Sequence, residues 1–229
     1  MRLFTLFAFG MLMTTAVSAQ DDCTALFKWL EPQVGLTYTD YNRKGKETGV
    51  STMTVRELQA VPEGTKAVID VEFADEKMQD YNLEYGMTCA GDKIIIDMSS
   101  MLNPAMMQSF GAMETEVEYD GIELPAKLSV GQRLNDGTVT VRSSMGAPGL
   151  GMTITVTTEN RQVAAQEQVT TPAGTFEAYK ITYDQNVKLL GSRRFSVVEW
   201  WNNEVGLIKS ESYGKNGKLQ SSHVLTARQ

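Results

Sequence analysis

Apolar and polar residues alternate along most of this chain, which is the pattern of β-strands with one side facing a core. The alternation is clear in residues 171–184, where Pro172 and Gly174 favour a tight turn ahead of an alternating run. A second alternating segment, 195–220, contains Asn216–Gly217, a pair suited to a two-residue hairpin turn. About a dozen such segments, with turn residues about every eight to twelve positions, predict an all-β protein.

This periodicity predicts a single domain built on a strongly curved antiparallel sheet, either half-barrel or sandwich-like. The segments 153–158 and 161–169 are expected as two separate strands. Residues 99–111 break the alternation. Within them, Asn103 can cap a helix and Pro104 can occupy its first position. We predict a short Met-rich helix there, packed on or near the concave side of the sheet.

The amino terminus has the order of a secretory signal peptide: one basic residue, an apolar run over 3–13, and small residues ending at Ala19. Cleavage after Ala19 would remove residues 1–19 and leave 20–229 as the all-β domain, exported to the periplasm. The apolar run is too short to cross about 30 Å of hydrocarbon, and no later segment has the roughly 20 apolar residues of a spanning helix. No transmembrane segment is therefore expected.

The chain has two cysteines, Cys23 and Cys89. In an oxidising compartment such a pair tends to form a disulfide, which would stabilise the fold by about 4 kcal/mol. Two cysteines are too few for a thiolate zinc cluster, and their spacing is not that of a redox motif. A lipid anchor on Cys23 is not expected, because polar residues rather than small apolar ones precede it.

Charge argues against nucleic acid as a partner. The sequence has 21 Lys and Arg against 28 Asp and Glu, a net charge of −7. Nucleic-acid affinity depends on phosphate contacts from clustered basic residues, and the one adjacent basic pair is Arg193–Arg194. By the same argument the sequence favours no anionic membrane surface.

No catalytic constellation or cofactor site is expected from the residues. The chain has one histidine, His223, so a histidine-rich metal site is not available and a nucleophile has little choice of base. Four acidic residues share one face of a predicted strand: Glu114, Glu116, Glu118 and Asp120. We interpret this row as a solvated edge strand, with calcium binding or a glycosidase-type carboxylate pair as alternatives.

Two apolar groups are candidate contact sites for a ligand or partner. Met106, Met107 and Phe110 belong to the predicted helix and would pack over the sheet or form the lid of an apolar site; copper binding by methionine sulfur is a weaker alternative. Trp200 and Trp201 are neighbours on a predicted strand, so they face opposite sides. One should belong to the core, and the other should be covered by a neighbour or exposed as a binding anchor.

The carboxyl third resembles a known family. The TPAGTF turn at 171–176, the Tyr-Lys-Ile strand after it, the aromatic pair, and the Val-Gly-Leu segment that leads to Lys-Ser-Glu are similar to secreted bacterial envelope proteins known as TapB-like or as a domain of unknown function. The resemblance implies a curved antiparallel β fold in the periplasm and a tetratricopeptide-repeat protein as partner. It implies no catalytic residues.

Two classes of function follow from these observations. The favoured hypothesis is a non-enzymatic periplasmic binding or scaffold protein that engages a protein along an edge strand or an apolar ligand inside the curved sheet. The alternative is a carboxylate-dependent hydrolase acting on an envelope glycan. The hydrolase requires a cleft with two carboxylates about 5 to 10 Å apart, whereas a binding protein requires a continuous apolar groove.

Overall fold

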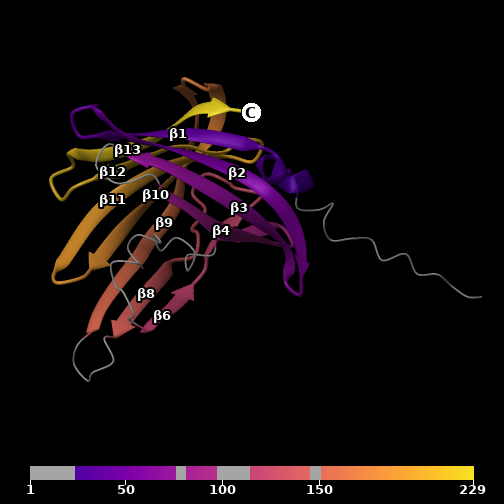
Figure 1. Ribbon diagram of the computed structural model, residues 1–229. Helices are drawn as coiled ribbons and strands as arrows, with labels where there is room; N and C mark the ends of the chain where they lie inside the picture. The colour runs from indigo at the N-terminus through magenta and orange to yellow at the C-terminus, as the bar shows by residue number, and fades with distance from the viewer. Residues whose placement is uncertain (1–23, 76–80, 97–113, 145–150) are drawn as a thin grey trace, which may run out of the picture.

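The computed structural model describes residues 24–75, 81–96, 114–144 and 151–229, which form one antiparallel sheet of thirteen strands (Figure 1). This confirms the predicted all-β class and the strongly curved sheet. In chain order the elements are the short 3-10 helix η1 (Lys28–Leu30) and the strands β1 (Gly35–Asn42), β2 (Glu47–Val61), β3 (Gly64–Asp75), β4 (Tyr81–Ala90), β5 (Lys93–Ile96), β6 (Glu114–Asp120), β7 (Ile122–Pro125), β8 (Gly137–Ser144), β9 (Gly151–Thr171), β10 (Gly174–Lys188), β11 (Ser192–Asn202), β12 (Gly206–Tyr213) and β13 (Leu219–Arg228).

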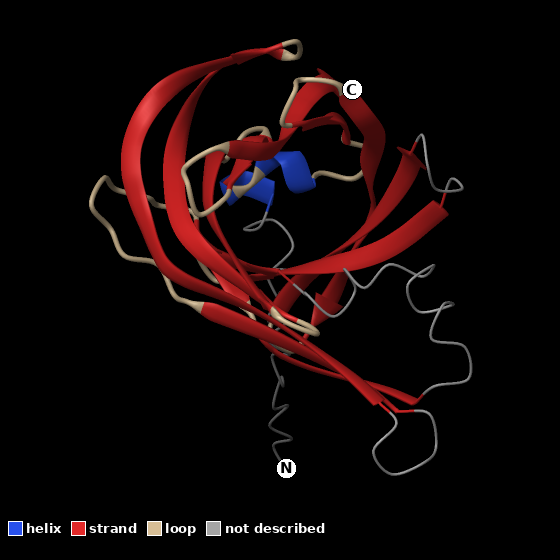
Figure 2. Ribbon diagram, turned by 90° about the vertical axis from the view of Figure 1, so that its left-hand side faces the viewer, coloured by secondary structure: helices blue, strands red, loops and turns tan. Residues whose placement is uncertain are grey.

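The sheet curves until its two ends meet. Its strand order is β6-β8-β9-β10-β11-β12-β13-β1-β2-β3-β4-β5-β7, so β6 and β7 stand at opposite ends. However, β6 ends at Asp120 and β7 begins at Ile122, with only Gly121 between them. This bent segment pairs with β8 through its first half and with β5 through its second half. The sheet is therefore nearly closed into a barrel, and Figure 2 looks into its hollow.

The bend at Gly121 leaves no room for a side chain. A Cβ atom at this position would lie 2.6 Å from Cγ2 of Ile95 on the adjacent strand β5. Such a contact is far inside normal van der Waals separation, so a larger residue would push β5 and β7 apart. Glycine at position 121 thus permits the close approach that lets one segment belong to both ends of the sheet.

A buried arginine connects the two ends on their inner side. Nη1 of Arg161 on β9 donates hydrogen bonds to the backbone carbonyls of Glu123 on β7 (3.0 Å) and Asn135 (2.8 Å). The side chain is 4% exposed, and burial lowers the pKa of its guanidinium. Because β7 has no hydrogen-bonded strand beyond it among the described residues, Arg161 satisfies a carbonyl that a neighbouring strand would otherwise engage. We call this junction of Gly121, β7 and Arg161 the seam.

Strand β9 corrects one expectation. The segments 153–158 and 161–169 are parts of one strand of 21 residues rather than two strands. Asn160 between them has φ of 60°, a conformation that asparagine adopts more readily than most residues. The pairing with β10 shifts register near this point, between Thr182 and Asp184. The polar residues around Asn160 therefore form an irregularity within one paired strand and not a turn between two strands. This irregularity orients Arg161 toward the seam.

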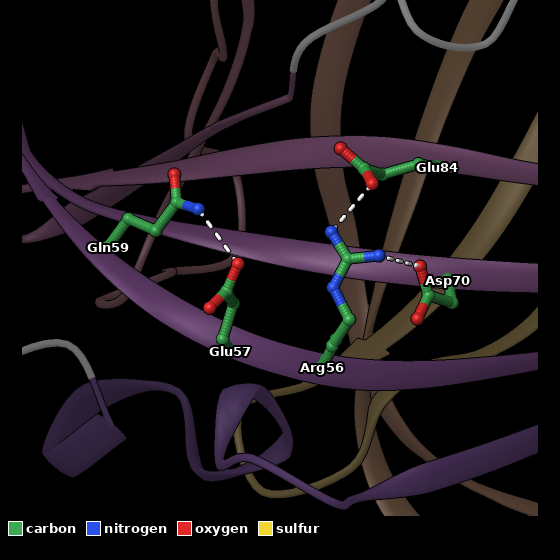
Figure 3. A network of polar contacts seen from close by, with 5 residues as sticks. All are labelled: Arg56, Glu57, Gln59, Asp70 and Glu84. Carbon is green, nitrogen blue, oxygen red and sulfur yellow. Dashed lines mark hydrogen bonds and ion pairs between the residues drawn. The ribbon is translucent and has the colours of Figure 1, made fainter.

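The inner and outer faces of β2 to β4 differ as the alternation predicts. Figure 3 shows the outer side, where Arg56 reaches from β2 across β3. Its guanidinium donates to Asp70 (2.9 Å) and to Glu84 (2.6 Å), and Gln59 donates to Glu57 beside it (2.9 Å). These groups are well exposed, so each pair stabilises the sheet only modestly.

Both predicted hairpin turns are present, and a third tight hairpin joins β1 to β2. Gly45 and Gly217 have φ of 72° and 69° at the tips of the β1–β2 and β12–β13 hairpins. The TPAGTF segment makes the β9–β10 hairpin, in which Thr171 pairs with Gly174 across Pro172 and Ala173. Turn chemistry in the sequence therefore sets these strand connections.

Several expectations fall outside the described residues: the signal peptide at 1–19, Cys23, and the Met-rich helix at 99–111 with Met106, Met107 and Phe110. Cys89 on β4 is disulfide-bonded, but the Cys23–Cys89 pairing stays a prediction because its other half is not described. Within the described ranges, no helix is long and apolar enough to cross a membrane.

Candidate functional site

The concave side of the sheet encloses a cavity of about 520 Å³. This volume is within the usual range for small-ligand sites. The segment around η1 lies in the hollow of the sheet (Figure 2), where Phe27, Trp29 and Leu30 are buried. Trp29 also lines the cavity, so the amino-terminal segment forms part of its wall.

One wall of the cavity is apolar and continuous across β2, β3 and β4. Met53 is paired with Val71, and Val71 with Leu83, so the three side chains form a cross-strand row on the cavity side. Tyr85 lies beside this row and directs its hydroxyl at the sulfur of Met53 (3.8 Å). Burial raises the pKa of Tyr85. The wall continues over β3 to β5 and β7 through Phe73, Met87, Ile96, Ile122 and Leu124.

The opposite wall is polar, and its side chains form a row across four adjacent strands. Glu199 on β11 is paired with Ser210 on β12, Ser210 with His223 on β13, and His223 with Asp40 on β1. All four residues line the cavity. Nδ1 of His223 lies 2.8 Å from Oδ1 of Asp40, and its ring stacks on Tyr38 with centroids 4.4 Å apart. We call these four residues the polar row.

Both carboxylate oxygens of Glu199 already accept hydrogen bonds from the protein. The hydroxyl of Tyr183 donates to Oε1 (2.8 Å), and the indole N–H of Trp201 donates to Oε2 (2.8 Å). Burial, together with the neighbouring carboxylate, raises the pKa of Tyr183. Arg161 also lines the cavity and interacts electrostatically with Glu199, so the residue that holds the seam contributes to the polar wall as well.

The polar row contains a serine, a histidine and an aspartate, but its setting does not suit acyl transfer. An oxyanion hole needs N–H groups aimed into the site. Ser210 and His223 lie inside paired antiparallel strands, whose backbone N–H groups point along the sheet to neighbouring strands. Asp40 and Glu199 belong to strands three spacings apart, about 14 Å along the sheet between their backbones, and both oxygens of Glu199 are already engaged, an arrangement unlike a glycosidase pair that faces one bond.

The predicted acidic row lies away from the cavity. Glu116, Glu118 and Asp120 are exposed on β6 at one end of the sheet, which fits a solvated edge. Glu118 forms an ion pair with Arg142 on β8 (2.8 Å). None of these three acids lines the cavity, so nothing in the described structure favours the alternative of a carboxylate pair over the solvated edge. Across the described residues, no cluster of three or more His, Cys, Asp or Glu could hold a metal ion.

The two adjacent tryptophans face opposite sides of β11. Trp201 lines the cavity and lies 6.3 Å from Trp29 between ring centroids. Trp200 is on the outer face, where the ammonium groups of Lys180 and Lys209 lie 5.4 and 5.2 Å from its ring centroid. Its indole N–H donates to Glu167 (2.7 Å). Both side chains are buried, so Trp200 is covered by its neighbours and only Trp201 is placed to contact a ligand.

Sequence reasoning missed most of the polar wall. Asp40, Ser210 and Glu199 come from strands far apart in the chain, and the alternation shows only that each shares a face with apolar neighbours. The available signal was a polar residue at an otherwise inward-facing position, as for Arg161 within 161–169. Such a residue marks a cavity or a buried polar network.

Comparison with known proteins defines the family and the fold. The DUF3108-like family model matches residues 34–225. A solved structure from Bacteroides fragilis, described as an exported protein with a YmcC-like fold, is 21% identical, covers 87% of this chain and 96% of its own, and has a TM-score of 0.68. A structure described as a lipoprotein, from Parabacteroides distasonis, is 20% identical, covers 87% of this chain and 98% of its own, and has a TM-score of 0.69.

No curated protein matches the sequence of this chain. The comparisons support the predicted resemblance to a domain-of-unknown-function family. The narrower TapB-like name stays a prediction, as does the tetratricopeptide-repeat partner.

Proposed function

This chain belongs to the DUF3108-like family, and we propose that it is a non-enzymatic protein that binds an amphiphilic ligand inside its curved sheet. The observation that carries the proposal is the cavity of about 520 Å³ with one apolar and one polar wall. An apolar chain would lie against the row of Met53, Val71 and Leu83. A polar head would face the polar row.

The ligand is favoured over a protein partner along an edge strand. The free edge of β6 is only seven residues long, and it carries the exposed acids Glu116, Glu118 and Asp120. Charged, short edges resist the addition of another strand. The other end of the sheet is engaged by Arg161 at the seam.

Binding is also favoured over hydrolysis of a glycan. The two acids of the cavity already have partners within the protein: Glu199 has both oxygens engaged by Tyr183 and Trp201, and Asp40 contacts His223. Most of the cavity lining is moreover apolar, which suits an acyl chain better than a polyhydroxylated sugar.

We place this activity outside the cytoplasm, in the periplasm. Two observations support the location: the signal-peptide pattern of residues 1–19 and the similarity in fold to proteins described as exported or as lipoproteins. A binding protein in this compartment would meet amphiphiles released from the envelope.

The test is a fluorescence titration of the purified protein with a fatty acid that carries an environment-sensitive fluorophore. Leu83→Trp inserts a larger ring into the apolar wall and should weaken binding at least about tenfold, or about 1.4 kcal/mol. Val130→Trp is the matched control, because Val130 is 60% exposed and does not line the cavity. Equal affinity of both variants and the parent protein would place the probe elsewhere and defeat the proposal.

A further inference from the structure

The tip of the β10–β11 hairpin exposes apolar side chains to an unusual degree. Leu190 is 97% exposed and Leu189 is 48% exposed. Only one other large apolar residue in the described part of the chain is comparably exposed, Val130. Single exposed leucines are common, but two adjacent ones at the end of a projecting hairpin form a convex apolar tip.

Basic residues flank the two leucines on both strands. Lys188 precedes them, Arg193 and Arg194 follow, and every residue from 188 to 194 is exposed. Arg194 forms an ion pair with Asp184 (2.8 Å), whereas no ion pair in the described ranges involves Lys188 or Arg193. The protein as a whole carries a net charge of −7. The tip is therefore a local positive site on an acidic protein, which the net charge conceals.

The hairpin continues directly from the wall of the cavity. Tyr183 and Gln185 on β10 line the cavity, and Lys188 follows three residues later. At about 3.3 Å per residue, the start of the tip is about 10 Å beyond Gln185. Whatever the tip touches is thus brought close to one end of the cavity.

We propose that this tip, residues 188–194, docks on the surface of an anionic lipid bilayer. The leucines enter the boundary between head groups and acyl chains, and the basic side chains contact the anionic head groups. A fluid bilayer fits a convex tip because it deforms around it, whereas a folded protein would need a preformed pocket with an acidic rim. This docking is independent of the cavity's ligand, although it would place the cavity beside a source of amphiphiles.

The experiment is vesicle flotation of the purified protein. Vesicles of phosphatidylcholine mixed with phosphatidylglycerol should carry the protein upward, and vesicles of pure phosphatidylcholine should carry much less. Changing Leu189 and Leu190 together to serine should lower the partition coefficient at least about tenfold, since burial of one leucine alone is worth that much. Changing Lys188 and Arg193 to glutamine should lower it about fivefold for each charge removed.

The β12–β13 hairpin provides the matched control. It carries Lys215 and Lys218 but no exposed leucine, so Lys215→Gln with Lys218→Gln should change flotation little. If this control lowers binding as much as the tip variants, general electrostatics explains the effect and the proposal is wrong. Absence of flotation, or flotation that is unaffected by the leucine changes, would also overturn it. Capture of an acidic envelope protein by the tip without vesicle binding would replace the bilayer with a protein partner.

Discussion

Replacing Arg161 with methionine should open the seam. Methionine has a similar length and an apolar character, so it fills the space but donates no hydrogen bond to the carbonyls of Glu123 and Asn135. Hydrogen bonds from a charged donor contribute about 1.5 to 3 kcal/mol each, so the two bonds correspond to about 3 to 6 kcal/mol. Relief of the burial cost of the guanidinium offsets part of this loss. We expect a net loss of about 3 kcal/mol.

The assay is urea unfolding followed by tryptophan fluorescence, because Trp29 and Trp201 are both buried in the hollow. Thermal unfolding is a second measurement: for a protein of this size, a loss of about 3 kcal/mol corresponds to a decrease of about 6 to 12 °C in the thermal midpoint. Arg161→Lys should lose less free energy of unfolding than Arg161→Met, because an ammonium group still donates hydrogen bonds to carbonyls. Some loss should remain, because lysine lacks the planar fork of a guanidinium.

Arg133→Met is the matched control for the same region. Arg133 is exposed and its backbone bridges to Gln162, the neighbour of Arg161, so its removal should change stability by less than about 0.5 kcal/mol. If Arg161→Met also costs less than about 1 kcal/mol, the hydrogen bonds at the seam do not hold the sheet closed and the reasoning fails.

Three further predictions concern stability. Gly121→Val should cost at least about 2 kcal/mol in urea unfolding, because its side chain would strain the bend. The hydrogen bond from Arg194 holds the pKa of Asp184 below its usual range. The ionised Asp184 therefore stabilises the folded protein fully above about pH 4, and this stabilisation is lost as the pH falls through the lowered pKa. The urea midpoint of the parent protein should fall in acid, and that of Asp184→Asn should fall less. Non-reducing mass spectrometry should find Cys23 joined to Cys89, and Cys23→Ser should cost about 4 kcal/mol.

The sequence was sufficient for the elements that depend on local chemistry. Alternation and turn residues predicted the strands, and Gly174 and Gly217 are at the turns where they were expected. Closure of the sheet could not be predicted, because it depends on a bend at Gly121 that looks like any turn glycine. The length of β9 was missed for a related reason: the polar residues around Asn160 resemble a turn but form an irregularity within a paired strand.

The candidate site was less accessible to sequence reasoning than the fold. Trp201 was identified because adjacent residues on a strand must face opposite sides. His223 was dismissed as a lone residue, since its neighbours Asp40 and Ser210 come from other strands and their register is a tertiary property. The acidic row on β6 attracted attention through local repetition, which reflects the edge of the sheet and not a site.

The pairing of β13 with β1 has a consequence for how this protein can be made. Leu36 is opposite Arg228, so the chain's first strand finds one of its two partners only when nearly the last residue is present. Until then one edge of β1 is unpaired, and the sheet is not yet continuous from β6 to β7, so its two ends cannot meet at the seam. Pairing across such a separation is slow and leaves intermediates prone to association. A protein built this way would benefit from a holding chaperone during synthesis and delivery, and truncation by even a few carboxyl-terminal residues should be poorly tolerated.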